Sequence, residues 1–185
     1  MITGKHVVLV LTRPEDMPAI RKIAAQSAEW LFRDGGELSL DSLEAVLLSA
    51  ADGTCSRLWS AWRAGEIIGF ASMNDIDPVS RSAEGRFLGL RADAGGIWVY
   101  ADILHTMARF GFTKLNLNRL TVRNYEDHHA VNALYKKGGF VLEGTAREAV
   151  WRDGRYVGMN FWALLAAEWR ASQDTTGKDD TATRS

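Results

Sequence analysis

The sequence predicts an α/β (α+β) fold in which a mixed sheet of about seven strands is flanked by about four helices, on both of its faces. Strand-type and helix-type runs follow one another in the order β, α, α, three strands, α, β, α and two strands. The strand, helix, strand succession in the middle implies a right-handed crossover between parallel strands. With 185 residues, of which 46% are hydrophobic, the chain can bury one good-sized core.

The first strand and two helices are expected before the central strands. His6–Leu11 is a strand candidate, and Thr12 then opens a capping box with Glu15, so a helix should begin there. The apolar residues of this helix recur at helical spacing and are Met17, Ile20, Ile23 and Ala24. A second helix is expected to start near Asp41. Its apolar face would consist of Leu43, Val46, Leu47 and Ala50.

Three strands are expected next. Leu58–Arg63 and Ile67–Met73 are rich in β-forming residues, and the short segment 64–66 between them predicts a hairpin. The turn-forming residues of Asn74–Pro78 should end that unit. Ala83–Leu90 is the third strand candidate, and the small residues of the following loop cannot continue it.

A helix, a strand, a helix and a final hairpin complete the expected order. Leu115–Val122 alternates apolar and polar residues like a half-buried strand, and Asp127 can cap the next helix. Val141–Trp151 and Tyr156–Leu165 should pair through Asp153-Gly154, which is a strong hairpin signal. Helical spacing before and after the single strand is shown by Ile97, Ala101, Leu104, Ala108 and Phe112, and by Val131, Leu134 and Tyr135.

Residues 1–170 are expected to form a single domain, and residues 171–185 a disordered C-terminal tail. The tail contains no large apolar side chain and therefore cannot offset the entropy lost on ordering. The order of elements shows no internal repeat before the tail.

Composition restricts the partners and the compartment. The 22 basic and 23 acidic side chains give a formal net charge of -1, which provides no overall field for nucleic acid or an anionic membrane. The apolar runs are too short to span a bilayer, and Met1–Leu11 lacks the features of a secretory signal. The one cysteine, Cys55, excludes an internal disulfide and leaves no thiolate cluster for zinc. We therefore expect a cytoplasmic protein.

Four segments resemble successive elements of the GNAT superfamily of acyl-CoA-dependent N-acyltransferases, in particular its branch of ribosomal-protein and small-amine acetyltransferases. They are, in chain order, FTKLNLNRLTV, ALYKKGGFVLEGTARE, DGRY and ALLAAEW. The resemblance is strongest over Phe112–Trp169 and extends more weakly back to Ala83. It implies a GNAT-like, mostly antiparallel sheet.

The same resemblance implies an enzyme that moves an acetyl group from acetyl-CoA to a primary amine by direct attack, without a metal. The acceptor would be a small amine, such as a polyamine or an amino sugar, or a protein N-terminus. A homodimer is left open. The alternative is a non-catalytic module that binds acyl-CoA and regulates, because the loop expected to hold the cofactor departs from the family pattern.

The resemblance places Tyr135 where many members carry a tyrosine close to the cofactor sulfur. A phenol with a pKa of about 10 can donate a hydrogen bond or a proton to a departing thiolate. The alternative is that Tyr135 only packs beside Val131, one turn earlier on the same helix face.

Glu84 is the second catalytic candidate, because a protonated amine must lose a proton before or during attack. It lies in the strand that would border the acyl group. A strand glutamate can equally face solvent, and the four histidines, His6, His105, His128 and His129, are alternatives as the base.

The expected cofactor contacts begin where this strand ends. The resemblance implies that the strand parts from its neighbour and exposes backbone groups to the pantetheine arm at Leu88, Gly89 and Leu90. Main-chain N–H groups and the helix dipole would then meet the pyrophosphate in the segment RADAGGIWVY. The residues expected there are Arg91, Gly95, Gly96, Ile97 and Trp98.

Two registers fit this loop. Reading from Arg91 gives a near match to the family pattern, whereas counting back from Phe112 places Gly95 at the arginine position and puts Trp98 and Tyr100 where small residues belong. Both registers keep the glycine pair in the loop. Trp98 could crowd a phosphate or stack on an adenine, and the glycines could also merely end the strand.

The start of the next helix also departs from the family. Relatives often have an asparagine seven residues before the tyrosine, where this chain has His128, and Asn132 follows one turn later. Either side chain could contact the pantetheine arm or be a solvated helix residue. Adjacent histidines on a helix rarely bind one ion, so we expect no metal here.

Overall fold

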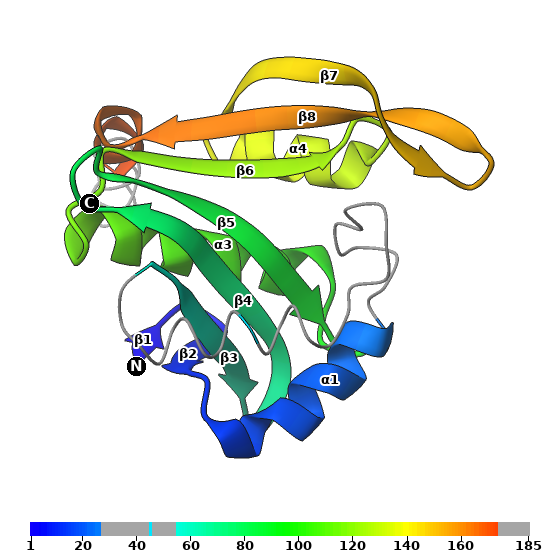
Figure 1. The fold of residues 1–185 in the computed structure, drawn as a ribbon. Helices are drawn as coiled ribbons and strands as arrows, with labels where there is room; N and C mark the ends of the chain where they lie inside the picture. The colour runs from blue at the N-terminus through cyan, green and yellow to red at the C-terminus, as the bar shows by residue number, and fades with distance from the viewer. Residues whose placement is uncertain (27–44, 46–54, 174–185) are drawn as a thin grey trace, which may run out of the picture.

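The computed structural model describes residues 1–26, 45 and 55–173, and its strands form a single eight-stranded sheet (Figure 1). The strand order is β1-β2-β3-β4-β5-β6-β8-β7. The strands are β1 (Ile2–Thr3), β2 (Val8–Leu11), β3 (Arg57–Arg63), β4 (Glu66–Asp77), β5 (Ser82–Leu90), β6 (Arg119–Tyr125), β7 (Val141–Arg152) and β8 (Arg155–Leu165). The helices are the 3₁₀ helix η1 (Pro14–Asp16), α1 (Met17–Gln26), α3 (Ile97–Thr113) and α4 (His129–Lys137), and residues 166–173 are also helical.

Every neighbouring pair of strands is antiparallel except β5 and β6, which are parallel and are joined through α3. The predicted fold class is therefore confirmed, including the helical crossover in the middle of the chain. The additional strand is the two-residue β1, which is too short for sequence periodicity to reveal.

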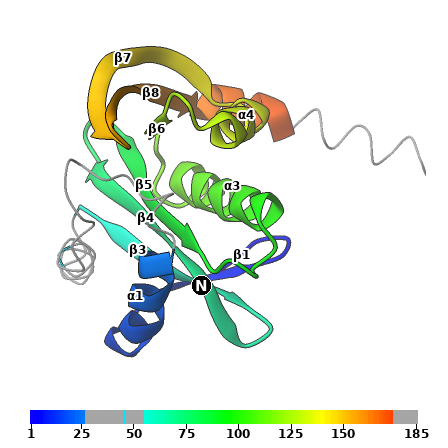
Figure 2. The same ribbon diagram turned by 90° about the vertical axis from the view of Figure 1, so that its right-hand side faces the viewer.

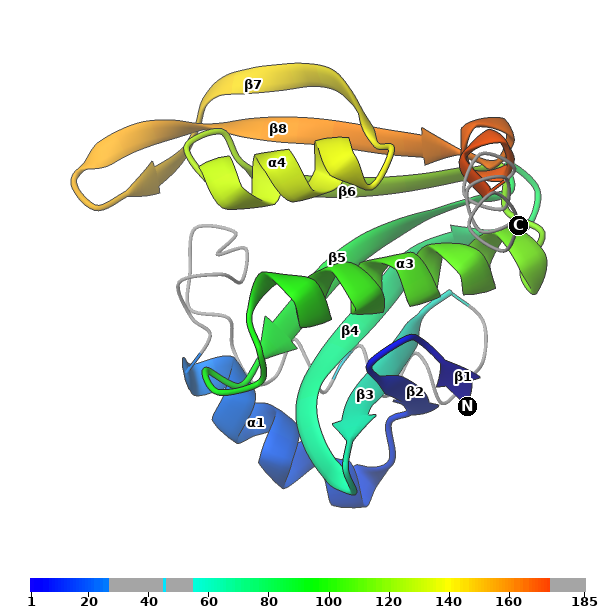
Figure 3. The ribbon, with the colours of Figure 1, turned by 180° about the vertical axis from the view of Figure 1, so that it is seen from behind.

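The helices form two layers, one on each face of the sheet (Figures 2 and 3). Helices α3 and α4 cover one face, where the larger core contains Trp59, Ile103 and Leu134, and Phe110 meets the Trp59 ring edge-on at 5.4 Å. Helix α1 covers the other face with a smaller cluster. That cluster consists of the four predicted helix residues Met17, Ile20, Ile23 and Ala24 together with Leu58 and Phe70.

The predicted capping box at Thr12 is wrong by one residue. The Arg13 N–H donates to the carboxylate of Asp16 at 3.0 Å, and Ser60 Oγ donates to the same carboxylate at 2.9 Å. Asp16 is buried against β3, whereas Glu15 faces solvent. Thr12 joins this cluster only through Ser60, at 3.0 Å. The acid that caps the turn is thus also bound by a partner 44 residues away along the chain, which a local pattern does not report.

Two predicted strand limits are also wrong. Strand β4 continues to Asp77 because Asn74 is buried, donates to Ser56 Oγ at 3.3 Å and accepts a hydrogen bond from Ser72. The turn follows instead, with the Asp77 carboxylate accepting the N–H of Val79 at 2.8 Å. Strand β6 starts at Arg119 rather than at Leu115, since Asn116, at a φ of 54°, turns the chain before it.

The predicted tail begins too early, because residues 171–173 continue the helix that starts at 166. The rest of the tail and the helix predicted near Asp41 lie outside the described residues.

Candidate functional site

The site is built where β5 and β6 part. The two strands pair from Ser82↔Arg119 to Gly85↔Val122, although β5 continues to Leu90 and β6 to Tyr125. Figure 1 shows the two ribbons diverging beyond the paired stretch. The three predicted strand contacts, Leu88, Gly89 and Leu90, lie in the diverging part, where their backbones pair on the other edge with β4.

Position 89 requires a glycine because the ring of Phe70, on the neighbouring strand β4, lies close to its Cα. A Cβ at this position would lie 2.4 Å from Cε1 of Phe70, which is buried in the α1 cluster. Backbone in this stretch is therefore held tightly against β4, while its opposite edge faces away from that strand.

The loop after β5 turns into α3 through the predicted glycine pair. Gly95 and Gly96 have φ angles of 99° and 64°, which side-chain-bearing residues rarely adopt. A Cβ on Gly96 would meet nothing within 4 Å, so there is open space directly before the helix. The first N–H groups of a helix have no partner within it, which leaves those of Ile97 and Trp98 available to an anion.

Trp98 projects from the first turn of α3 with 69% of its surface exposed, and Lys137 Nζ lies 5.4 Å from the centre of its ring. These two side chains stand at one end of an apolar groove of about 410 Å³ between α3 and α4. The groove is also lined by Ala101, His105, Ala133 and Trp169. It provides room for a planar group beside the glycine loop.

The predicted phosphate ligand Arg91 is already paired. Its guanidinium binds the carboxylate of Asp93 through Nε at 2.5 Å and that of Glu66 through Nη1 at 3.0 Å. These two neighbours raise the pKa of Arg91 further, and two carboxylates against one guanidinium leave the cluster with a net negative charge.

Tyr135 is buried, and its hydroxyl shares a hydrogen bond with the hydroxyl of Tyr100 from α3. Its ring packs against Phe140 and Trp162, with ring centres 5.6 and 6.0 Å away. Burial, with the charge and hydrogen bond of Tyr100 adding to it, raises the pKa of Tyr135 well above its ordinary value. The phenol therefore keeps its proton at neutral pH. Tyr135 does not line the α3–α4 groove, and Tyr100 stands as its partner.

Glu84 lies on the opposite face of the sheet. Its neighbours Ala83 and Gly85 point toward α3, so Glu84 points toward the α1 side. Its carboxylate binds Arg123 Nε at 2.5 Å and Arg86 Nη2 at 2.8 Å. The candidate base is thus held between two guanidinium groups.

His128 is the N-cap residue of α4, in place of the predicted Asp127. The Asp127 carboxylate does not cap the helix. Its Oδ2 instead accepts Arg155 Nη2 at 2.5 Å from the β7–β8 hairpin. The His128 Nε2 atom lies 3.2 Å from Arg152 Nη1, and the ring meets Tyr125 edge-on. Burial, and secondarily the Arg152 charge, lowers the pKa of His128.

Asn132 uses both ends of its amide inside the protein. Its Oδ1 accepts hydrogen bonds from Asn124 at 2.7 Å and from Asn160 at 3.0 Å, and its Nδ2 donates to the Glu126 carbonyl at 2.8 Å. Trp162 Nε1 donates to Asn124 and extends the network. Asn132 therefore fixes α4 against β6 and β8 in this structure.

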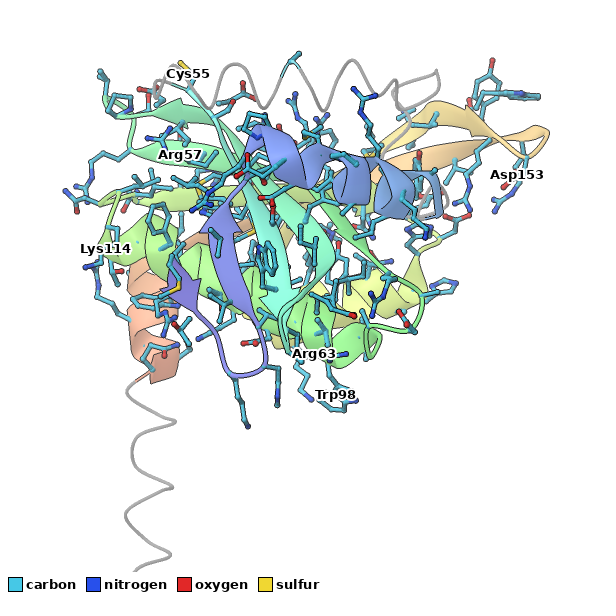
Figure 4. All side chains as sticks on the ribbon, turned by 90° about the horizontal axis from the view of Figure 1, so that it is seen from below. Cys55, Arg57, Arg63, Trp98, Lys114 and Asp153 are labelled. Carbon is cyan, nitrogen blue, oxygen red and sulfur yellow. The ribbon has the colours of Figure 1, made fainter. Side chains whose placement is uncertain are left out.

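Four residues that sequence reasoning did not assign belong to this region: Tyr100, Lys137, Arg123 and Arg63. Arg63, labelled in Figure 4, ends β3. Its Nη1 would lie 3.3 Å from a Cβ placed on Gly95. Their contacts join residues that are 30 or more positions apart in the chain, which local patterns do not report. Of the four, only Tyr100 was noticeable in the sequence, because one register of the loop puts this bulky residue where the family has small ones.

Across residues 1–26 and 55–173, no group of three or more His, Cys, Asp or Glu side chains is placed to hold a metal ion. None of the helices in the described part of the chain is long and apolar enough to cross a membrane.

Comparison with known proteins gives consistent matches. A family model for the acetyltransferase (GNAT) domain matches residues 6–141. A curated Bacillus subtilis protein named "Putative ribosomal N-acetyltransferase YdaF" is 23% identical over 180 residues, which is 92% of this chain and 97% of that protein. The Escherichia coli ribosomal-protein-serine acetyltransferase is 27% identical over 113 residues, 60% of this chain and 61% of the relative.

Among solved structures, the spermidine N-acetyltransferase from Vibrio cholerae in complex with CoA and spermine superposes with a TM-score of 0.79. It is 21% identical and the match covers 90% of this chain and 99% of the other. At this identity the likeness is evidence for the fold, in which the sheet opens beside the glycine loop as described above.

Proposed function

Because this chain belongs to the acetyltransferase (GNAT) family and is an acetyl-CoA-dependent N-acetyltransferase, we propose that its acceptor is the α-amino group of a peptide or protein. The family match spans most of the chain, from residue 6 to residue 141. Membership confirms the predicted enzyme class and thioester donor. The acceptor and the residue roles below are our proposals.

The donor side of the site is assigned to the face of α3 and α4. Acetyl-CoA supplies an acetyl group activated as a thioester. The N–H groups after Gly95 and Gly96 would bind its diphosphate, and the open space at Gly96 fits a bulky anion. The diverging edge of β5 over 88–90 would accept the pantetheine arm.

Tyr135 is proposed to protonate the departing sulfur. Transfer forms an amide bond and breaks the thioester bond, the amine loses a proton, and the sulfur must gain one. A buried phenol whose pKa is raised well above its ordinary value stays protonated until that moment. For this role the Tyr135 hydroxyl has to exchange its bond with Tyr100 for one to the sulfur.

The proposed acceptor follows from the state of Glu84. A carboxylate already bound by Arg123 and Arg86 offers little to an incoming ammonium group. An α-amino group has a pKa of about 7.8, so about one molecule in seven is neutral at pH 7, against about one in 2,500 for a lysine-like amine. An acceptor that is partly neutral in solution depends less on a carboxylate to remove its proton, and therefore suits a site in which Glu84 is already bound by two arginines.

The charges on the α1 side of the sheet agree with this choice. Arg86 also binds Asp75 at 3.0 Å, so the two acids and two arginines around Glu84 balance. A polycation such as spermidine finds no excess of negative charge in that cluster. The names of the two curated relatives, which refer to ribosomal proteins, also support a protein N-terminus.

A thiol-release assay tests the acceptor. Purified enzyme with acetyl-CoA should release free thiol with peptides that carry a free N-terminus, and should release far less with the same peptides after N-terminal blocking. Spermidine should be a poor acceptor at pH 7. If spermidine exceeds every peptide in kcat/KM, the acceptor proposal is wrong, although the enzyme class stands.

We also propose a cytoplasmic location, which the single exposed cysteine, Cys55, favours. Self-association to a homodimer is proposed on the strength of β7, an edge strand exposed along most of its length. Light scattering coupled to size-exclusion chromatography measures this directly, and a monomer at micromolar concentration would refute it.

A further inference from the structure

The guanidinium group of Arg63 lies against the loop that precedes α3. Arg63 is the last residue of β3, and its Nη1 atom would be 3.3 Å from a Cβ placed on Gly95. Figure 4 shows the Arg63 and Trp98 side chains projecting from the same edge of the molecule. Arg63 therefore reaches the glycine loop from a different hairpin, across 32 positions of sequence.

Arg63 has neither an ion pair nor a hydrogen bond of its guanidinium to any of the residues that the structure describes. The N-terminal end of a helix is itself positive, so a cation held there is unfavourable unless an anion lies close by. Arg63 and the amides that open α3 thus point their positive ends at the same region.

The cation that the sequence suggested for this region cannot balance a diphosphate. Arg91 is bound to Asp93 and Glu66, and that cluster carries a net negative charge. Lys137 lies at the end of α4, and its Nζ atom is over the Trp98 ring, 5.4 Å from the ring centre. Among the described residues that touch the glycine pair, Arg63 supplies the unpaired positive charge.

We propose that Arg63, and not Arg91, pairs with the diphosphate of coenzyme A. This inference rests on the proposed donor site and adds a binding residue from outside the loop. A guanidinium forms charge-assisted hydrogen bonds to phosphate oxygens, often two at once, while the main-chain N–H groups fix the position of the same group. The arrangement replaces the loop arginine expected of the family by one from the β3–β4 hairpin.

Isothermal titration of coenzyme A into wild type, Arg63→Gln, Arg63→Lys and Arg91→Gln tests the proposal. Loss of a charge-assisted contact should raise the Kd of Arg63→Gln about 10- to 100-fold. Arg63→Lys should recover part of the affinity, because it keeps the charge without the planar fork. Arg91→Gln, the matched control, should stay within about threefold of wild type.

Two further ligands identify the group that Arg63 binds. The loss in Arg63→Gln should persist with dephospho-coenzyme A, which lacks the 3′-phosphate, and should vanish for turnover of S-acetylpantetheine, which lacks the diphosphate. A loss that disappears with dephospho-coenzyme A would assign Arg63 to the 3′-phosphate and overturn the proposal. An equal loss with S-acetylpantetheine would show a general structural effect and overturn it too.

Apo-protein stability separates binding from folding. Because Arg63 stands unpaired at a helix start, Arg63→Gln should unfold at the same temperature as wild type or slightly higher. If wild type binds coenzyme A and Arg63→Gln binds it equally well, this inference fails while the proposed function survives. If wild type binds no coenzyme A, both fail.

Discussion

The hydroxyl groups of Tyr100 and Tyr135 are joined by a hydrogen bond that links the start of α3 to the end of α4. Both phenols are raised in pKa by burial, and Tyr135 more strongly because Tyr100 adds to the effect. A sulfur that approaches Tyr135 must therefore compete with Tyr100. In this structure, Tyr135, the proposed proton donor, is hydrogen-bonded to Tyr100.

Replacing Tyr135 by phenylalanine should remove the proton donor and keep the ring packing against Phe140 and Trp162. We expect kcat to fall about 100-fold or more, with the Kd of coenzyme A within about threefold of wild type. Steady-state kinetic assays measure kcat, and titration calorimetry on the same preparation measures the Kd of coenzyme A. Unchanged kcat would exclude the role, and a parallel loss of affinity would indicate that Tyr135 only supports the site.

Replacing Tyr100 by phenylalanine should release the Tyr135 hydroxyl. Since the charge and hydrogen bond of Tyr100 both raise the pKa of Tyr135, that pKa should fall toward the ordinary value of 10 without reaching it, because burial remains. Phenolate absorbance during alkaline titration reports the shift. The chain has four tyrosines, so Tyr156→Phe, at a 60% exposed position, provides the spectral control.

The same variant distinguishes two roles for Tyr100. If Tyr100 merely occupies the partner position, kcat of Tyr100→Phe should equal or exceed that of wild type. A loss as large as in Tyr135→Phe would instead mean that the proton passes through both phenols.

Sequence patterns predicted the elements well wherever they depend on local chemistry. The Asp153-Gly154 hairpin is present, with φ angles of 50° and 78° at its two turn residues, and the helical spacing of Ile20 and Ile23 marks a real buried face. The residue contacts within the candidate site could not be predicted from local patterns. Glu84 meets Arg123 across 39 positions, which periodicity cannot register.

The same reason explains the misplaced caps. Asp127 has the chemistry of an N-cap, yet it precedes the N-cap residue His128 by one position, and Arg155 binds its carboxylate at 2.5 Å. The partner of this carboxylate lies 28 residues away along the chain, where a local pattern cannot identify it. Sequence patterns can therefore predict which residue types form a site, but not which partner each side chain binds.

Glu84→Gln should have a modest effect if the carboxylate serves to hold Arg86 and Arg123. We expect kcat to drop less than about tenfold, whereas removal of a general base costs about 100- to 10,000-fold. Asp75→Asn, at the other carboxylate bound to Arg86, is the matched control. A loss above 100-fold that is specific to Glu84→Gln would restore Glu84 as the base and weaken the argument for an α-amino acceptor.

Asp102→Asn should destabilise the fold without touching the donor site. The buried Asp102 carboxylate accepts the N–H groups of Lys5, His6 and Val7 at 2.9, 2.5 and 3.0 Å, and so ties the first turn of the chain to α3. The amide offers one acceptor oxygen in place of two, so unfolding free energy should fall by about 1–3 kcal/mol. Asp153→Asn, in an exposed turn, should change it by less than about 0.5 kcal/mol. Urea denaturation of both variants gives the comparison.

Acidification should weaken the fold through His128. Burial and the neighbouring Arg152 lower its pKa below the ordinary 6.5, while the Asp127 charge opposes them only partly. Arginine is always protonated, so Nε2 of His128 must accept from Arg152 Nη1 at 3.2 Å, and a protonated ring would lose that bond and repel the guanidinium.

The sign of the effect follows from proton linkage. Well above pH 6.5 the imidazole is neutral in both states and contributes nothing to the pH dependence of stability. As the pH falls below 6.5, the unfolded chain binds a proton that the folded chain does not, so stability decreases toward the lowered pKa of the folded state. Melting temperatures of wild type and His128→Gln between about pH 5 and pH 7.5 test this. Subtracting one melting temperature from the other removes the contribution of the carboxylates, which both proteins share. As the pH falls, the melting temperature of wild type should decrease more than that of His128→Gln. A difference that is constant across the range would show that His128 titrates alike in both states.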